Sequence, residues 1–212
     1  NNKSIIFYGI LLFIFIITYN FIWLNKTYPM AEGWAQIYSN LIDKGKIPYK
    51  DFYYYLPPLN LLIDYVFWKL SFGFVIIYRL WRLTERLLIA SITYKLLIGK
   101  TNPCIAFLTV FISIVLGSSS CYDLIGDYNQ TEMLLVLLLG LALLKYISIT
   151  ANNKKSKIYL VLSGFIGGLM FLLKQTVVLS SFLVFSAIII ILYFKGKEQK
   201  LYRVFGYVFL GV

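Results

Sequence analysis

Carboxylates and lysines are the residues most able to do chemistry in this 212-residue sequence, because it contains no histidine. The lack of imidazole excludes Ser-His and Cys-His catalysis and imidazole metal sites within this stretch, so acid–base chemistry falls to Asp, Glu, Lys or Tyr. The main candidates are Glu32, Asp51, Asp127 and Lys174. A carboxylate can deprotonate a hydroxyl, and two can hold Mg²⁺ or Mn²⁺ through oxygen. A lysine at the edge of hydrocarbon suits a lipid phosphate.

Each candidate also has a purely structural interpretation. Glu32 can stabilise the start of a helix, where an acid interacts favourably with the dipole. Asp51 can be a surface turn residue beside Lys50, and Asp127 can be a loop acid ahead of a helix. Lys174 can extend along apolar surface to reach the interface. Both interpretations stay open at this point, as does a divalent cation shared by two of the acids.

The elements that must position these residues are membrane helices. Apolar and aromatic residues make up 60% of the chain and charged residues 14%, whereas a soluble domain has about half and a quarter. The apolar residues form runs long enough to cross a bilayer, without the alternation of barrel strands. We therefore predict an all-α, polytopic transmembrane helix bundle, with further membrane helices beyond Val212. The predicted spans lie near 5–24, 75–98, 104–117, 131–147, 158–173 and 177–194, with a seventh starting near 203.

The net charge of +11 follows from membrane topology and does not indicate a nucleic-acid partner. Lys and Arg lie in short loops between the apolar runs, as the positive-inside rule expects. Segments 152–157 and 195–200 are basic, whereas 118–130 lacks Lys and Arg and carries Asp123 and Asp127. We predict a multi-pass protein of the plasma membrane with a cytoplasmic N-terminus. Loop 25–74 and the four candidate residues then lie on the external face.

Loop 25–74 contains two further helical patterns. Apolar residues recur at helical spacing over 34–44 and 58–70, with Ser39 and Asp64 among the polar residues on the opposite faces. Gly45 predicts the end of the first helix. Two short amphipathic helices joined by a Pro- and Tyr-rich turn are typical of a membrane interface. An irregular loop enclosed by protein is the alternative.

An arginine stripe lies within the apolar span 75–98. Arg79, Arg82 and Arg86 recur at helical spacing, with Glu85 close by. Because charged groups face lipid only at high cost, the stripe should face protein or a wet cavity. We predict that these arginines pair with Glu85 and other acids, and ligand binding is the alternative. In span 158–173, Gly164, Gly167 and Gly168 predict close helix packing.

Several motifs distributed along nearly the whole chain resemble one family. They are Glu32-Gly33-Trp34, Gly45-Lys46-Ile47-Pro48-Tyr49-Lys50-Asp51-Phe52-Tyr53, Leu56-Pro57-Pro58-Leu59, Gly126-Asp127-Tyr128 and Gly168-Leu169-Met170-Phe171-Leu172-Leu173-Lys174-Gln175-Thr176. Their order and spacing resemble the C-fold (GT-C) membrane glycosyltransferases. The most similar branch contains the protein O-mannosyltransferases and the aminoarabinose transferase of lipid A.

The resemblance implies a transferase that takes a sugar from a polyprenyl-phosphate donor and gives it to a hydroxyl of a glycan, lipid or protein. In the family, an acid at the start of the first loop helix acts on the acceptor or on a metal, and Glu32 matches that position. Asp127 resembles the second-loop acid that faces the same cavity, and Asp51 is a second candidate for the metal or substrate. Lys174 lies where a contact to the donor phosphate is expected.

Arg79, Tyr128 and Gln175 are candidates for supporting roles. In the motifs, Tyr128 follows Asp127 and Gln175 follows Lys174. One departure matters, because many relatives carry Asp-Glu where this chain has Ala31-Glu32. A catalytically inactive relative with a scaffolding role is therefore an alternative. A lipid or polysaccharide carrier is another, but it should place polar groups near the bilayer midplane, whereas these acids cluster outside.

Overall fold

The computed structural model describes residues 2–23, 31–72, 74–117, 128–148 and 154–194, together with Val204 and Val208. Within these residues it contains eight α-helices and no strand, which confirms the predicted all-α class for this part of the chain. The helices are α1 (Asn2–Trp23), α2 (Ala31–Asp43), α3 (Pro58–Leu70), α4 (Val75–Ile98), α5 (Pro103–Gly117), α6 (Tyr128–Ser148), α7 (Lys154–Leu173) and α8 (Gln175–Phe194).

Three stretches of helix are long and apolar enough to cross a membrane: Asn2–Ile22, Tyr128–Ser148 and Ser156–Leu173. Pro103–Leu116 and Gln175–Ile188 are apolar but shorter. All six runs predicted as spans are helical where the structure describes them. The seventh span predicted near 203 lies outside the described residues, apart from Val204 and Val208. The chain is therefore membrane-associated, whereas its number of crossings and its orientation stay predictions.

The outer surface of α1 is apolar. Ile6, Phe7, Phe21 and Ile22 are each about 60% exposed, and they lie along the whole helix. Soluble proteins rarely expose apolar surface of this extent unless it contacts a partner or a membrane. The exposed face of α1 therefore fits lipid.

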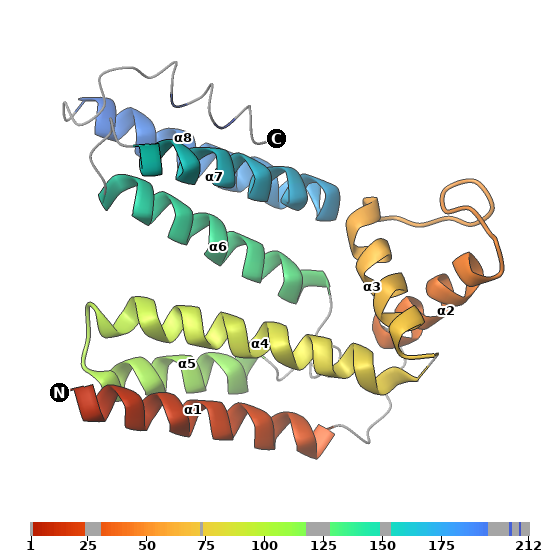
Figure 1. Cartoon of the computed structure of the whole chain (residues 1–212), viewed down its shortest axis with the longest axis horizontal. Helices are drawn as coiled ribbons and strands as arrows, with labels where there is room; N and C mark the ends of the chain where they lie inside the picture. Colours follow the sequence, from red (N-terminus) through yellow and green to blue (C-terminus); the bar gives the residue numbers. More distant parts are fainter. Residues whose placement is uncertain are drawn as a thin grey trace. The chain divides into compact units, whose positions relative to one another are not determined.

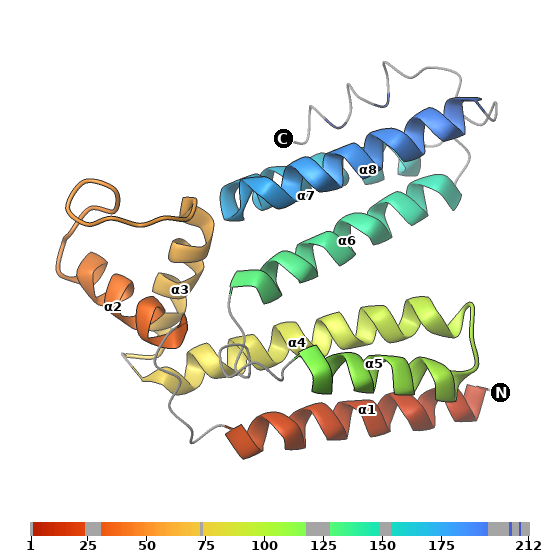
Figure 2. The same ribbon diagram turned by 180° about the vertical axis from the view of Figure 1, so that it is seen from behind.

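The chain divides into two units, and unit 1 comprises Asn1–Tyr54 and Leu61–Leu134. Its helices α1, α4 and α5 lie side by side (Figures 1 and 2). Small residues at the contact, Ala90 of α4 and Ala106 of α5, are almost completely buried and let the helix backbones approach closely. The core that they share consists of Leu12, Ile16, Ala90, Tyr94, Ala106 and Val110.

Helix α2 ends where the sequence predicts. Gly45 has a φ of 78°, a left-handed conformation that glycine adopts without strain. The amide of Gly45 donates to the carbonyl of Ile42, and the amide of Lys46 donates to that of Leu41. These two hydrogen bonds form a Schellman motif, which satisfies carbonyls that the end of the helix leaves without partners.

Helix α3 runs across the direction of α1, α4 and α5 in both views (Figures 1 and 2). It exposes Leu62, Val66 and Leu70 and buries Asp64. A soluble amphipathic helix has the reverse arrangement, with its apolar face buried. The exposed apolar stripe of α3 therefore fits the interfacial helix that the sequence predicts at 58–70.

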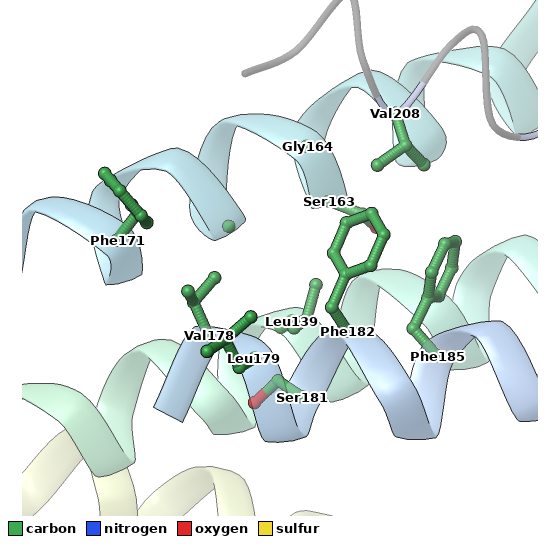
Figure 3. Close-up of a pocket in the computed structure, with 11 residues that line it drawn as sticks. Leu139, Ser163, Gly164, Phe171, Val178, Leu179, Ser181, Phe182, Phe185 and Val208 are labelled. Carbon is green, nitrogen blue, oxygen red and sulfur yellow. The ribbon is translucent and has the colours of Figure 1, made fainter. Parts of the chain in front are cut away.

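Unit 2 comprises Tyr55–Asn60 and Leu135–Val212, and α7 packs against α8 within it. These helices and α6 line an open cavity of about 230 Å³, whose lining includes Leu139, Phe171 and Phe182 (Figure 3). Gly164 and Gly167 also line it, and a Cβ atom added to Gly167 would meet no atom within 4 Å. Gly167 therefore faces open space, whereas close packing at Gly164 and Gly168, the two glycines four residues apart, stays a prediction.

Candidate functional site

Glu32 and Arg79 form the central ion pair of the candidate site. Glu32 lies in the first turn of α2, and Arg79 lies in the second turn of α4. Nε of Arg79 donates to Oε1 of Glu32, and Nη2 donates to Oε2, each over 2.7 Å. Only 7% of the Glu32 side chain and 12% of the Arg79 side chain are exposed. Two parallel charge-assisted bonds fix the relative position of the side chains, and they are among the stronger polar contacts in proteins.

Both residues of this pair were predicted to belong to the site, Glu32 as the catalytic acid and Arg79 as a supporting residue. Each carboxylate oxygen has two lone pairs, and Arg79 uses one lone pair on each. A lone pair therefore remains on each oxygen for a further ligand. The guanidinium fork binds phosphate with the same two-pronged geometry, so carboxylate and phosphate are interchangeable partners for Arg79.

A second cluster surrounds Arg82, one helical turn further along α4. Its Nη1 donates to Oε2 of Glu85 over 2.8 Å and to Oγ1 of Thr131 over 2.7 Å. Its Nη2 donates to Oδ1 of Asp64 over 3.1 Å, and the ring of Tyr78 lies 5.0 Å from the guanidinium carbon. Arg82 and Glu85 are fully buried. The cluster therefore ties α4 to α3 and to the start of α6.

Further hydrogen bonds extend this cluster along α4. The hydroxyl of Thr131 donates to Oε1 of Glu85 over 2.7 Å, and the amide of Gln130 donates to the carbonyl of Arg82. Arg86 donates to the side-chain oxygen of Asn20 over 3.1 Å, which links α4 to α1. Helix α4 thus contacts four other helices of unit 1 through polar side chains.

The predicted pairing with acids is confirmed for Arg79 and Arg82, whereas Arg86 hydrogen-bonds to the amide side chain of Asn20. Arg82 pairs with Glu85 and with Asp64, and Arg79 pairs with Glu32. Buried charges carry a desolvation cost, which is offset only when partners of opposite charge and further hydrogen bonds are well placed. Glu85, Asp64 and Thr131 supply such partners to Nη1 and Nη2 of Arg82, so these contacts hold the surrounding helices together.

Sequence reasoning missed most partners from other helices. It placed Asp64 on the polar face of 58–70 without a partner, and it gave Asn20, Gln130 and Thr131 no role. A signal was available, because Asn20, Gln130 and Thr131 are polar residues near the ends of helices that are otherwise apolar. Polar side chains in apolar helices often hydrogen-bond across to a neighbouring helix.

Asp51 lies in the exposed turn that follows α2. Its carboxylate accepts a hydrogen bond from the amide of Ile47 over 2.8 Å, and its own amide donates to the carbonyl of Ile47. These bonds hold together a turn in which Tyr49 has a φ of 65°. The structure thus gives Asp51 a local structural role, and its metal or substrate role stays a prediction.

The other predicted residues are only partly described. Asp127 lies outside the described residues, and Tyr128 is the half-buried first residue of α6. Lys174 is half-buried between α7 and α8, where its amide donates to the carbonyl of Met170 over 2.8 Å. Gln175 is the exposed first residue of α8. Lys174 and Gln175 belong to unit 2, whereas Glu32 belongs to unit 1.

Within the residues that the structure describes, no group of three or more Asp, Glu, Cys or His side chains is arranged to hold a metal ion. Asp127, one of the acids predicted to bind a cation, lies outside those residues. A divalent cation at this site therefore stays a prediction. No protein-family model, curated protein or solved structure matches the chain.

Proposed function

We propose that this chain belongs to a membrane glycosyltransferase, which moves a sugar from a polyprenyl-phosphate donor to a hydroxyl of a glycan, lipid or protein. The observation that carries the proposal is the pairing of Glu32 with Arg79, a buried acid at a helix start held by a buried arginine. The motif resemblance supports it independently, because it singles out the same acid. In this proposal the site lies on the external face of the plasma membrane.

The transfer step needs one base and one leaving group. Glu32 takes the proton of the acceptor hydroxyl while that oxygen attacks the anomeric carbon of the sugar. The new carbon–oxygen bond forms as the bond from the anomeric carbon to the phosphate oxygen breaks, and its electron pair leaves with the polyprenyl phosphate. Attack from the face opposite the leaving group inverts the anomeric configuration. A positioned general base typically contributes about 10²–10⁴-fold to the rate.

Arg79 links donor binding to activation of the base. In the structure two of its three donor nitrogens, Nε and Nη2, face Glu32. The donor phosphate competes for the same guanidinium fork, since phosphate and carboxylate fit it equally well. When the phosphate binds, it neutralises Arg79 and frees the oxygens of Glu32 to accept the hydroxyl proton. Charge that develops on the leaving phosphate is then stabilised by a cation already in place.

The motif resemblance alone proposes Lys174 for the donor phosphate, independently of Arg79. A divalent cation held by Asp127 or Asp51 would supply further Lewis-acid stabilisation of the leaving group. The outward apolar face of α3, with Leu62, Val66 and Leu70, lets the polyprenyl tail stay in lipid while the head group reaches the polar cluster.

A carrier is the second candidate function. Arg86 lies halfway along α4, and Glu85 lies beside it, so buried charge occurs well inside a helix of 24 residues. Carriers place their binding sites near the bilayer midplane. These charges already hydrogen-bond to Asn20, Arg82 and Thr131, which favours a structural role for them.

The direct test uses membranes that contain the full-length protein and a panel of radiolabelled polyprenyl-phosphate sugars. We expect label to move from the lipid fraction to an acceptor in these membranes and not in protein-free membranes. Lys174→Ala should raise the donor concentration needed for half-maximal transfer. Asp127→Asn should lower the rate of sugar transfer. The loss should be larger if a chelator also lowers the rate of transfer by the unaltered protein. Label that crosses the bilayer while still attached to the lipid would favour the carrier instead.

The external location has its own test. A cysteine at Lys155 should be protected from an impermeant thiol reagent added to intact cells, and a cysteine at Ser119 should react. These positions lie in the segments predicted as cytoplasmic and external from their content of Lys and Arg. The opposite labelling pattern would place Asp127 in the cytoplasm and overturn the external site.

A further inference from the structure

The turn between α2 and α3 presents three exposed lysines: Lys44, Lys46 and Lys50. Within the described part of the chain, none of the three forms an ion pair with a carboxylate. Lys69 of α3 differs, because it pairs with Asp43, and the hydrogen bond to that carboxylate raises the pKa of Lys69. Asp51 is the one acid within residues 44–53, so the turn with its three lysines carries a net positive charge.

The same turn also exposes apolar and aromatic side chains. Ile47 and Tyr49 are each 53% exposed, and Tyr53 is 81% exposed. Tyrosine is enriched at membrane–water interfaces, where its ring lies at the level of the lipid head groups. Lysine is a compact point charge that suits a phosphate group. The lysine turn, residues 44–53, thus combines both side-chain types that contact a lipid head-group layer.

The lysine turn is held in a defined conformation. The ring of Tyr38 in α2 stacks on Phe52 with 5.5 Å between the ring centres, and it meets Tyr54 edge-on at 5.0 Å. Tyr54 is buried, and the carboxylate of Asp51 closes the turn on the amide of Ile47. The exposed lysines and aromatic rings therefore project from a scaffold that is already ordered.

We propose that the lysine turn binds the head groups of anionic phospholipids in the membrane that surrounds the helices. Charge complementarity identifies the ligand, and the exposed apolar residues Trp34 and Val66, on the two helices that flank the turn, favour lipid as its source. A lysine near an anionic bilayer surface contributes a preference of roughly fivefold at low salt. The proposal goes beyond glycosyl transfer and does not depend on it.

Lipid selectivity beside the turn tests the proposal. A fluorophore is attached to Asn40→Cys, an exposed position on α2, in the full chain with Cys104 and Cys121 replaced by serine. The protein is placed in phosphatidylcholine nanodiscs with a trace of head-group spin-labelled phosphatidylglycerol or phosphatidylcholine. The ratio of quenching by the two lipids measures local enrichment. We expect anionic lipid to quench roughly fivefold more or better, and salt at about 1 M to remove the difference, because it shortens the Debye length to about 3 Å.

The triple variant Lys44→Gln, Lys46→Gln and Lys50→Gln should bring the quenching ratio close to one, and the matching triple Lys→Arg variant should keep it high. A control that replaces Lys154, Lys155 and Lys157 by glutamine should leave the ratio unchanged. Equal quenching in the unaltered chain, or a ratio that survives the glutamine variant, would overturn the proposal. Inorganic phosphate is then added at an ionic strength at which chloride has no effect on the quenching ratio. If phosphate brings the ratio to one, the turn binds a free phosphate ligand instead.

Discussion

The interiors of the two units differ in chemical character. Unit 1 buries Glu32, Asp64, Arg82, Glu85 and Arg86, whereas the cavity of unit 2 is lined mainly by apolar side chains with two serines among them (Figure 3). Both units contain helices that are apolar enough to span a membrane. The apolar helices that both units share therefore do not determine what the interior contains.

The two units are held together by different kinds of contact. In unit 1, ion pairs with fixed directions link α4 to α2 and to α3, so the positions of these charged side chains are closely specified. In unit 2, contacts such as those of Leu160 with its neighbours in the core are non-directional, and an unfilled space of about 230 Å³ remains. A single substitution should consequently cost far more in unit 1 than in unit 2.

The largest effect on stability should come from Arg82→Met. This change leaves the carboxylates of Asp64 and Glu85 buried without their cation, and breaking a buried ion pair in this way costs about 3–5 kcal/mol. Thermal unfolding in detergent measures it. The matched change in unit 2 is Met170→Leu, at a side chain that is 1% exposed, and a volume-conserving swap should cost less than about 1.5 kcal/mol. Equal losses for the two variants would contradict the contrast between the units.

The next effect concerns the pair of Glu32 and Arg79. Glu32→Gln and Arg79→Gln should each lower stability, because each leaves a largely buried charge without its partner. The double variant should be less destabilised than the sum of the single variants, with a coupling of about 0.5–3 kcal/mol. If Glu32 interacted only with the dipole of α2, its substitution would show no coupling with that of Arg79. Additive losses of stability in the double variant would therefore contradict the ion pair.

The smallest effect should be a gain in unit 2 from Gly167→Ala. The new methyl group would meet no atom within 4 Å, so it adds no clash. Alanine is favoured over glycine inside a helix by about 0.8–1.0 kcal/mol, and the variant should unfold at a slightly higher temperature. A clear loss of stability would show that the space beside Gly167 is filled.

The positions of the helices were predictable from sequence because each follows from a local pattern. Apolar runs predict α1 and α5–α8, an apolar run interrupted by the arginine stripe predicts α4, and Gly45 predicts the end of α2. The internal pairing of the arginine stripe was also predictable, since charge within an apolar helix requires a partner. These inferences need only the order of residues along the chain.

The identity of most partners was not predictable. The contact of Arg82 with Asp64 joins residues 18 apart, and its contact with Thr131 joins residues 49 apart. Which helix lies against which depends on packing among many side chains, and the period of one helix carries no information about it. For the same reason, Glu32 was predicted to be a site residue while its partner Arg79 was assigned only a general supporting role.

Sugar transfer by Glu32→Gln tests the central claim most directly, because the change keeps the size of the side chain and removes its charge. Asp43→Asn is the matched control, since Asp43 is an exposed acid on the same helix and pairs only with Lys69 among the described residues. With a polyprenyl-phosphate sugar as donor, and with rates corrected for the folded fraction, transfer by Glu32→Gln should fall by roughly 10²–10⁴-fold. Asp43→Asn should transfer at the rate of the unaltered chain. A folded Glu32→Gln protein that transfers sugar at nearly that same rate would show that the base lies elsewhere.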